Sequence, residues 1–142
     1  MSRGFTLVEL AIGIVVVAIL AAVALPRLRP ALDRVAADAA AREITVALAV
    51  TRHAAIRQGQ RARLRIGPDS LWLELAEGAT WRLLTAWPGP VAHGVQLQVS
   101  NPVVTYAPNG IGWGASNTTV RLRRGSQIET ITTSRIGRVK RW

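Results

Sequence analysis

The chain has 142 residues and contains no cysteine, which excludes a disulfide framework and thiol chemistry. Its 18 Lys and Arg residues outnumber 8 Asp and Glu residues, so the formal net charge at pH 7 is +10. Such an excess of cations either favours an anionic partner, namely nucleic acid, lipid headgroups or an acidic protein surface, or has no dedicated ligand.

The first predicted element is an apolar helix over residues 5–25, which is long enough to cross a bilayer. A cleaved secretory signal would have a shorter apolar region followed by small residues, whereas this one ends at Pro26 and Arg27. A buried core helix is disfavoured because so small a domain could not cover it. We therefore expect a transmembrane helix.

One carboxylate, Glu9, interrupts this apolar segment. A charged side chain in the hydrocarbon core costs about 2.5–3.5 kcal/mol on insertion scales. Glu9 therefore either lies near the membrane edge and reaches water, or it has a partner that neutralises it.

The segment Gly4-Phe5-Thr6-Leu7-Val8-Glu9-Leu10 resembles the processing motif of type IV pilins and type II secretion pseudopilins. The resemblance implies that a prepilin peptidase removes residues 1–4 as a leader by cutting after Gly4, and that Phe5 becomes an N-methylated first residue. It also implies that Glu9 is an assembly residue, which pairs with the Phe5 amine of a neighbouring subunit in a filament.

Helical spacing continues over residues 26–58, where Pro26 and Pro30 kink a helix without ending it, and Gly59 provides a stop signal. The apolar positions of this amphipathic continuation form two stripes, which are Leu28, Leu32, Val35 and Ala39, followed by Ile44, Ala47, Leu48, Thr51 and Ala55.

After Gly59 the apolar period changes to two, which predicts short strands over residues 59–142. A helix followed by seven or eight short strands indicates an α+β fold with an antiparallel β-domain. The expected strands are near residues 61–66, 71–75, 81–84, 95–99, 103–106, 120–122, 128–131 and 136–141, with loops at 87–90 and 108–117.

Three segments, AVTRHAAIRQGQRARLRI, VTYAPNGIGWG and IETITTSRIGRVKRW, resemble the GspH/FimT branch of the pilin superfamily. The resemblance implies a long helix packed on two small antiparallel sheets. It also implies a minor pilin or pseudopilin, a structural subunit of a type II secretion pseudopilus or a type IV pilus. Such a protein crosses the inner membrane once, places its β-domain in the periplasm or outside the cell, and assembles with other pilin subunits.

No residue pattern predicts catalysis, a cofactor or a metal. His53 and His93 do not belong to any metal-ligand spacing, and the acidic residues are too scattered to suggest an acid–base pair. We therefore expect a non-enzymatic protein.

The basic C-terminal segment offers an alternative function, DNA binding for uptake in natural transformation. Cations beside the aromatic Trp142 could contact phosphates and stack on bases. Gly137-Arg138-Val139-Lys140 resembles the Gly-Arg-x-Arg motif of DNA-binding FimT-like minor pilins, although Lys replaces the planar Arg at the last position. The candidate residues are Arg121, Arg123, Arg135, Arg138, Lys140 and Arg141, of which Arg141 should face away from Lys140 in a strand.

A second basic group lies on the first predicted strand, where Arg61, Arg63 and Arg65 share one face. The favoured interpretation is a solvated face whose alternation sets the strand register.

Overall fold

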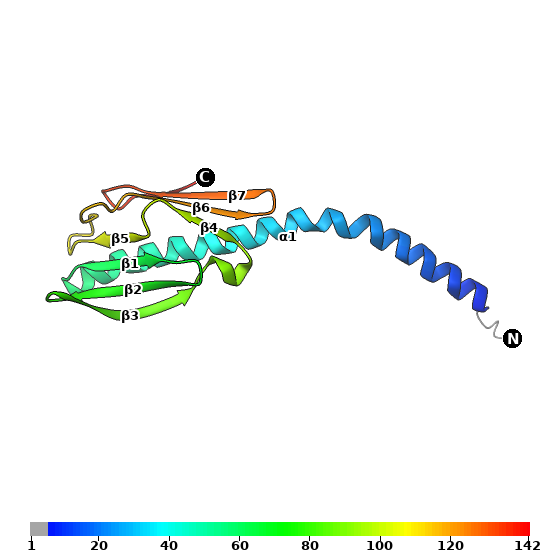
Figure 1. The fold of residues 1–142 in the computed structure, drawn as a ribbon, viewed down its shortest axis with the longest axis horizontal. Coiled ribbons are helices and arrows are strands. Elements are labelled where there is room, and N and C mark those ends of the chain that lie inside the picture. The colour runs from blue at the N-terminus through cyan, green and yellow to red at the C-terminus, as the bar shows by residue number, and fades with distance from the viewer. Residues whose placement is uncertain (1–5) are drawn as a thin grey trace. The chain divides into compact units, whose positions relative to one another are not determined.

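The computed structural model describes residues 6–142, so Gly4 and Phe5, the predicted processing residues, lie outside the described part. The chain forms two compact units, Met1–Leu32 and Asp33–Trp142. Both contain part of one helix, α1 (Leu7–Gln58), and the second unit adds eight strands (Figure 1). The predicted α+β class is confirmed.

Helix α1 has 52 residues and continues through Pro26 and Pro30 without a break. Its N-terminal part is long and apolar enough to cross a membrane, and none of the apolar window is buried in the protein. The helix ends as predicted before Gly59, whose φ of 61° is the left-handed conformation typical of a residue just beyond a helix.

The C-terminal part of α1 buries one face in the core of the second unit. The predicted stripe from Ile44 to Ala55 is confirmed, because all five of its residues are buried. The earlier stripe lies on the helix as predicted but is not covered by the β-domain, because Leu28, Leu32 and Val35 are exposed. The first buried residues of the helix after this stripe are alanines, namely Ala37, Ala40 and Ala41.

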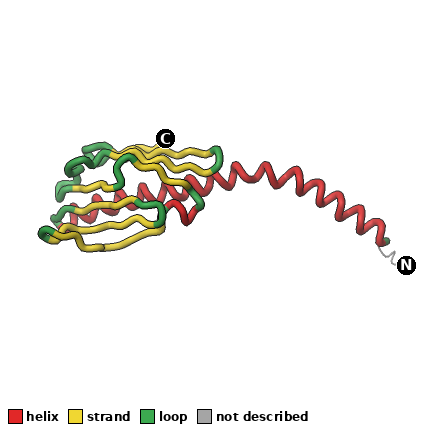
Figure 2. Tube along the Cα trace, viewed as in Figure 1, coloured by secondary structure: helices red, strands yellow, loops and turns green. Residues whose placement is uncertain are grey.

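The strands form two four-stranded antiparallel sheets, as expected from the resemblance. Sheet A has the order β3-β2-β1-β5, and sheet B has the order β4-β6-β7-β8. Figure 2 shows the strands of both sheets running along the C-terminal part of α1. The strand bounds are β1 (Ala62–Ile66), β2 (Ser70–Glu77), β3 (Thr80–Pro88), β4 (Gln96–Val99), β5 (Val103–Tyr106), β6 (Thr118–Arg124), β7 (Gln127–Thr133) and β8 (Val139–Arg141).

A single hydrophobic core joins the helix to both sheets. Leu48 of α1, Leu64 of sheet A and Leu122 of sheet B are all fully buried in this cluster. Because each sheet turns its apolar face to the helix, the arginines that alternate with the buried residues of β1 lie on the outer face of sheet A.

Two segments differ from the predicted boundaries, and the loop predicted at 108–117 is confirmed. Trp87 and Pro88, expected in a loop, end β3, where proline is tolerated because β3 is an edge strand. Strand β8 is shorter than the predicted 136–141, because a turn closed by the bond from Ser134 N to Arg138 O precedes it. The loop at 108–117 is tied to β5 by a bond from Trp113 N to Thr105 O.

Candidate functional site

The carboxylate of Glu9 caps the N-terminus of its own helix. Its Oε2 accepts hydrogen bonds from both the backbone N and the Oγ1 of Thr6, each at 3.1 Å. The Glu9 backbone N donates in return to Thr6 Oγ1 at 3.2 Å. This reciprocal arrangement is a capping box, which satisfies N–H groups that otherwise lack partners in the first turn. The Thr-x-x-Glu spacing at the start of the apolar run was the sequence signal for it.

An open apolar groove runs along the helix beside Glu9. It has a volume of about 370 Å³ and is lined by Glu9, Leu10, Gly13, Ile14 and Val17. Gly13 lies one turn after Glu9, and a Cβ added there would meet nothing within 4 Å. Small residues at such positions allow a second helix to approach the backbone closely.

The outer face of sheet B carries part of the predicted basic group. Arg121 lies opposite Gln98 and Thr130, and Lys140 lies opposite Thr132. The neighbouring residues Val120, Leu122 and Ile131 are fully buried, so the paired positions beside them face outward. The exposed cations of this face are Arg121, Arg123 and Lys140, and Lys140 Nζ lies 3.5 Å from the ring centroid of Trp142.

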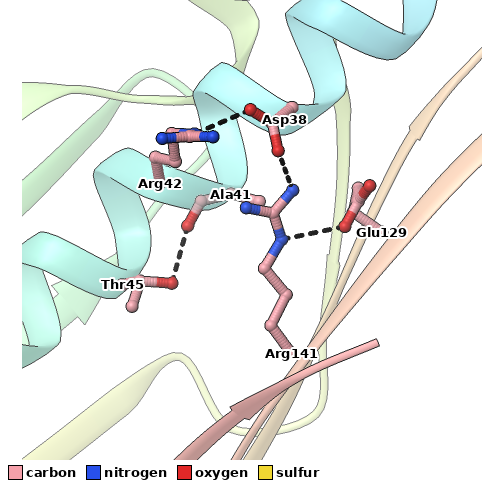
Figure 3. A network of polar contacts seen from close by, with 6 residues as sticks. All are labelled: Asp38, Ala41, Arg42, Thr45, Glu129 and Arg141. Carbon is pink, nitrogen blue, oxygen red and sulfur yellow. Dashed lines mark hydrogen bonds and ion pairs between the residues drawn. The ribbon is translucent and has the colours of Figure 1, made fainter.

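Arg141 faces inward, as its position next to Lys140 predicted. Its Nε donates to Glu129 Oε2 at 2.9 Å, and its Nη2 donates to Asp38 Oδ1 on α1 (Figure 3). The bond to Glu129 raises the pKa of the Arg141 guanidinium, and the bond from Arg141 lowers the pKa of the Asp38 carboxyl. Arg141 therefore ties β8 to the helix and does not belong to the outer basic face.

Arg138 lies neither on the outer face of sheet B nor beside Arg141, but in a cleft next to the helix. It lines a cleft of about 290 Å³ together with Arg52, His53 and Tyr106. Burial raises the pKa of the Tyr106 hydroxyl, so this group is neutral at ordinary pH. Arg135 is exposed in the turn before β8, where its backbone O accepts a bond from Gly112 N. The six candidate DNA-binding residues therefore do not form one patch.

Sheet A holds an arrangement that the sequence analysis missed. The side chains of Arg61, Arg63 and Arg65 stack on tryptophan rings of β2, β3 and the loop after β5 instead of extending freely into solvent. The distances from guanidinium carbon to ring centroid are 5.3 Å for Arg61 and Trp113, 4.2 Å for Arg63 and Trp81, and 4.7 Å for Arg65 and Trp72. The five tryptophans in a sequence with one Tyr and one Phe were the available signal.

Within residues 6–142, no group of three or more His, Cys, Asp or Glu side chains is placed to hold a metal ion. His93 Nε2 lies 2.9 Å from Glu43 Oε2, an ordinary pair between η1 (Pro90–His93) and the helix.

Two family models match the chain. The model of the type II transport protein GspH matches residues 40–137, and that of the prokaryotic N-terminal methylation motif matches residues 1–25. Together with the apolar helix, the second match indicates a membrane-anchored protein. No curated protein matches the chain.

The fold is similar to those of two solved proteins. The type IV minor pilin FimU of Pseudomonas aeruginosa is 16% identical with a TM-score of 0.65, and the match covers 75% of this chain and 88% of FimU. The minor pseudopilin EpsH of the Vibrio cholerae type 2 secretion system is 15% identical with a TM-score of 0.61, covering 75% of this chain and 95% of EpsH. Because the GspH model spans more than half of the sequence and the fold agrees, the chain belongs to the GspH family of type IV pilin-like proteins, which are structural subunits of pili and pseudopili.

Proposed function

We propose that this chain is a non-enzymatic minor subunit that enters a pilus or pseudopilus through Glu9. The observation that supports this role best is the placement of a carboxylate one turn inside an exposed apolar helix, beside a groove that contains Gly13. The helix anchors the subunit in the inner membrane as a single span before extraction, with the β-domain outside the cytoplasm.

The pairing of charges explains why a carboxylate is kept in this segment. Cleavage after Gly4 by a prepilin peptidase would create a cationic amine at Phe5, and N-methylation would leave that amine positively charged. A neighbouring subunit would bring this amine into the groove beside Glu9, where a low dielectric strengthens the attraction. The bonds from Thr6 hold the carboxylate on the helix surface until that amine arrives.

The capping box requires a test that separates assembly from helix stability. We expect Glu9→Ala to leave the protein in the membrane but to prevent its incorporation into filaments. Thr6→Val is the matched control, because it removes the hydroxyl from the cap and keeps the charge. Incorporation is measured as the amount of the chain that copurifies with sheared filaments, and a normal ratio for Glu9→Ala would refute the pairing.

The outer face of sheet B favours a second candidate function, DNA binding during uptake. Among the described residues, the outward positions of its four strands include three cations but no acid, and Trp142 follows β8 and contacts Lys140. Cations at strand spacing with an adjacent aromatic suit phosphate contacts and base stacking. The candidate site therefore centres on Arg121, Arg123 and Lys140. A salt series of DNA binding tests this role.

A further inference from the structure

We propose that the outer face of sheet A binds a carboxylate-rich segment of a different protein. The surface consists of Arg61, Arg63, Arg65, Trp72, Trp81 and Trp113 and is called the Arg/Trp face below. This inference does not depend on the assembly role of Glu9, because all of its residues lie in the unit Asp33–Trp142.

The register of sheet A holds the guanidiniums in place. Arg65 lies opposite Trp72, and Arg63 lies opposite Glu74, on strands that are antiparallel neighbours. Each guanidinium that rests on an indole ring has fewer accessible rotamers than a free arginine side chain. A ligand that binds here would lose less side-chain entropy than on an ordinary basic surface.

Among the described residues, the acid that points outward beside the Arg/Trp face is Glu74, and arginines already neutralise it. Glu74 is 9% exposed, and its carboxylate lies 2.5 Å from Arg63 Nε and 3.3 Å from Arg65 Nε. Within the described chain these contacts use the Nε atoms, and the terminal nitrogens of both guanidiniums make no hydrogen bond. Three arginines against one carboxylate leave a positive surface with unused donors, which suits planar carboxylates.

The composition of the Arg/Trp face favours a protein ligand over single-stranded nucleic acid. The rings of Trp72 and Trp81 already stack with guanidiniums, which reduces the ring surface that bases could occupy. Trp and Arg are also the residues that most often carry the binding energy at protein interfaces. Trp113 is 55% exposed and provides an apolar anchor at the margin of the face.

A second copy of this unit is a poor occupant, because it has few free carboxylates to offer. Of the seven acids in Asp33–Trp142, Asp69 has no cation within ion-pair distance among the described residues, and the other six contact an arginine or, in the case of Glu43, His93. The acids that contact an arginine are Asp33, Asp38, Glu74, Glu77 and Glu129. The ligand is therefore an acidic segment of another chain.

The test uses a fluorescently labelled decaglutamate peptide and the full chain in a neutral detergent. Binding is followed by fluorescence anisotropy, with unlabelled ten-nucleotide single-stranded DNA as a competitor. The variant Arg61→Gln/Arg65→Gln lowers the charge of the Arg/Trp face by two and retains the bond from Arg63 to Glu74. The matched control, Arg121→Gln/Arg123→Gln, removes the same charge from sheet B.

We expect the sheet A variant to weaken peptide binding by about tenfold and the sheet B variant by less than about threefold. Trp113→Ala, in an exposed loop, should also weaken binding, because Arg61 loses the ring on which its guanidinium rests. Equal losses in both double variants would show attraction to net charge alone. The proposal would also be overturned if the unmodified chain failed to bind the peptide. It would likewise be overturned if the DNA displaced the labelled peptide at a lower concentration than the unlabelled peptide does.

Discussion

Arg141, the second-to-last residue, forms an ion pair with Asp38 of α1, 103 positions earlier in the sequence. The same guanidinium pairs with Glu129 of β7 at 2.9 Å (Figure 3). Strand β8 has only three residues and lies at the edge of sheet B, and the Arg141 side chain connects it to the helix by an ion pair.

Replacing Arg141 with Ala should destabilise the β-domain. The substitution leaves Glu129 without its cation and removes the ion pair between β8 and the helix. We expect the Tm of the full chain in neutral detergent, followed by near-ultraviolet circular dichroism, to fall by about 5 °C. Lys140→Ala, on the opposite face of β8, is the control and should leave the Tm nearly unchanged. Equal shifts would refute the tie between β8 and the helix.

The ion pair at Asp38 should also make the free energy of unfolding depend on pH in the acidic range. Arg141 first, and then Arg42, lower the pKa of Asp38 in the folded protein below its ordinary value. The stabilisation is therefore fully present above the unfolded pKa of about 4 and is lost as the pH falls through the lower folded value. Urea unfolding between pH 6 and pH 2 should show a steeper loss for the unmodified chain than for Asp38→Asn. Parallel curves would contradict this assignment.

Gly13 provides a test of the groove beside Glu9. A leucine there should be tolerated in the isolated chain, because an added Cβ meets nothing within 4 Å, but its side chain would fill the space for a neighbouring helix. We expect Gly13→Leu to reach the membrane normally and to reduce incorporation into filaments at least about tenfold. Ala11→Leu, outside the groove lining, should assemble normally, and normal assembly of both variants would exclude this groove as the contact.

If the outer face of sheet B binds DNA, the salt dependence should reveal which cations take part. Each phosphate contact contributes about 0.9 to the slope of log affinity against log salt on duplex DNA. Arg121→Ala/Lys140→Ala should therefore lower the slope by about 2, whereas Arg138→Ala, in the cleft beside the helix, should change it little. An unchanged slope in the double variant would place any DNA site elsewhere.

The fold could largely be predicted from local patterns, because helix and strand periods are encoded within short segments. The alternation of Ala62, Leu64 and Ile66 with arginines predicted β1, and the spacing of Ile44 and Leu48 predicted the buried face of α1. The stripe at Leu28, Leu32 and Val35 has the predicted helical spacing, but its side chains are exposed. Periodicity identifies an apolar face without showing what covers it.

The candidate sites were less predictable, because they depend on which strands become neighbours. The contact of Arg63 with Trp81 spans three strands and an irregularity in register between Leu73 and Glu74, which no local pattern encodes. Strand alternation predicted that Arg141 and Lys140 lie on opposite faces of β8. The pairing of Arg141 with Asp38, in contrast, depends on the tertiary fold. The bond between Thr6 and Glu9 was local and could have been predicted from the capping-box spacing.

The central claim is that Glu9 acts through its charge, and Glu9→Gln tests it most directly. Glutamine can replace glutamate in a capping box, so the helix start is preserved while the charge that would bind a neighbouring amine is removed. The measurement is the ratio of this chain to the principal subunit in sheared, purified filaments, with equal membrane levels verified beforehand. We predict a ratio at least about tenfold lower for Glu9→Gln and a nearly normal ratio for Thr6→Val; a normal ratio for Glu9→Gln would contradict the account.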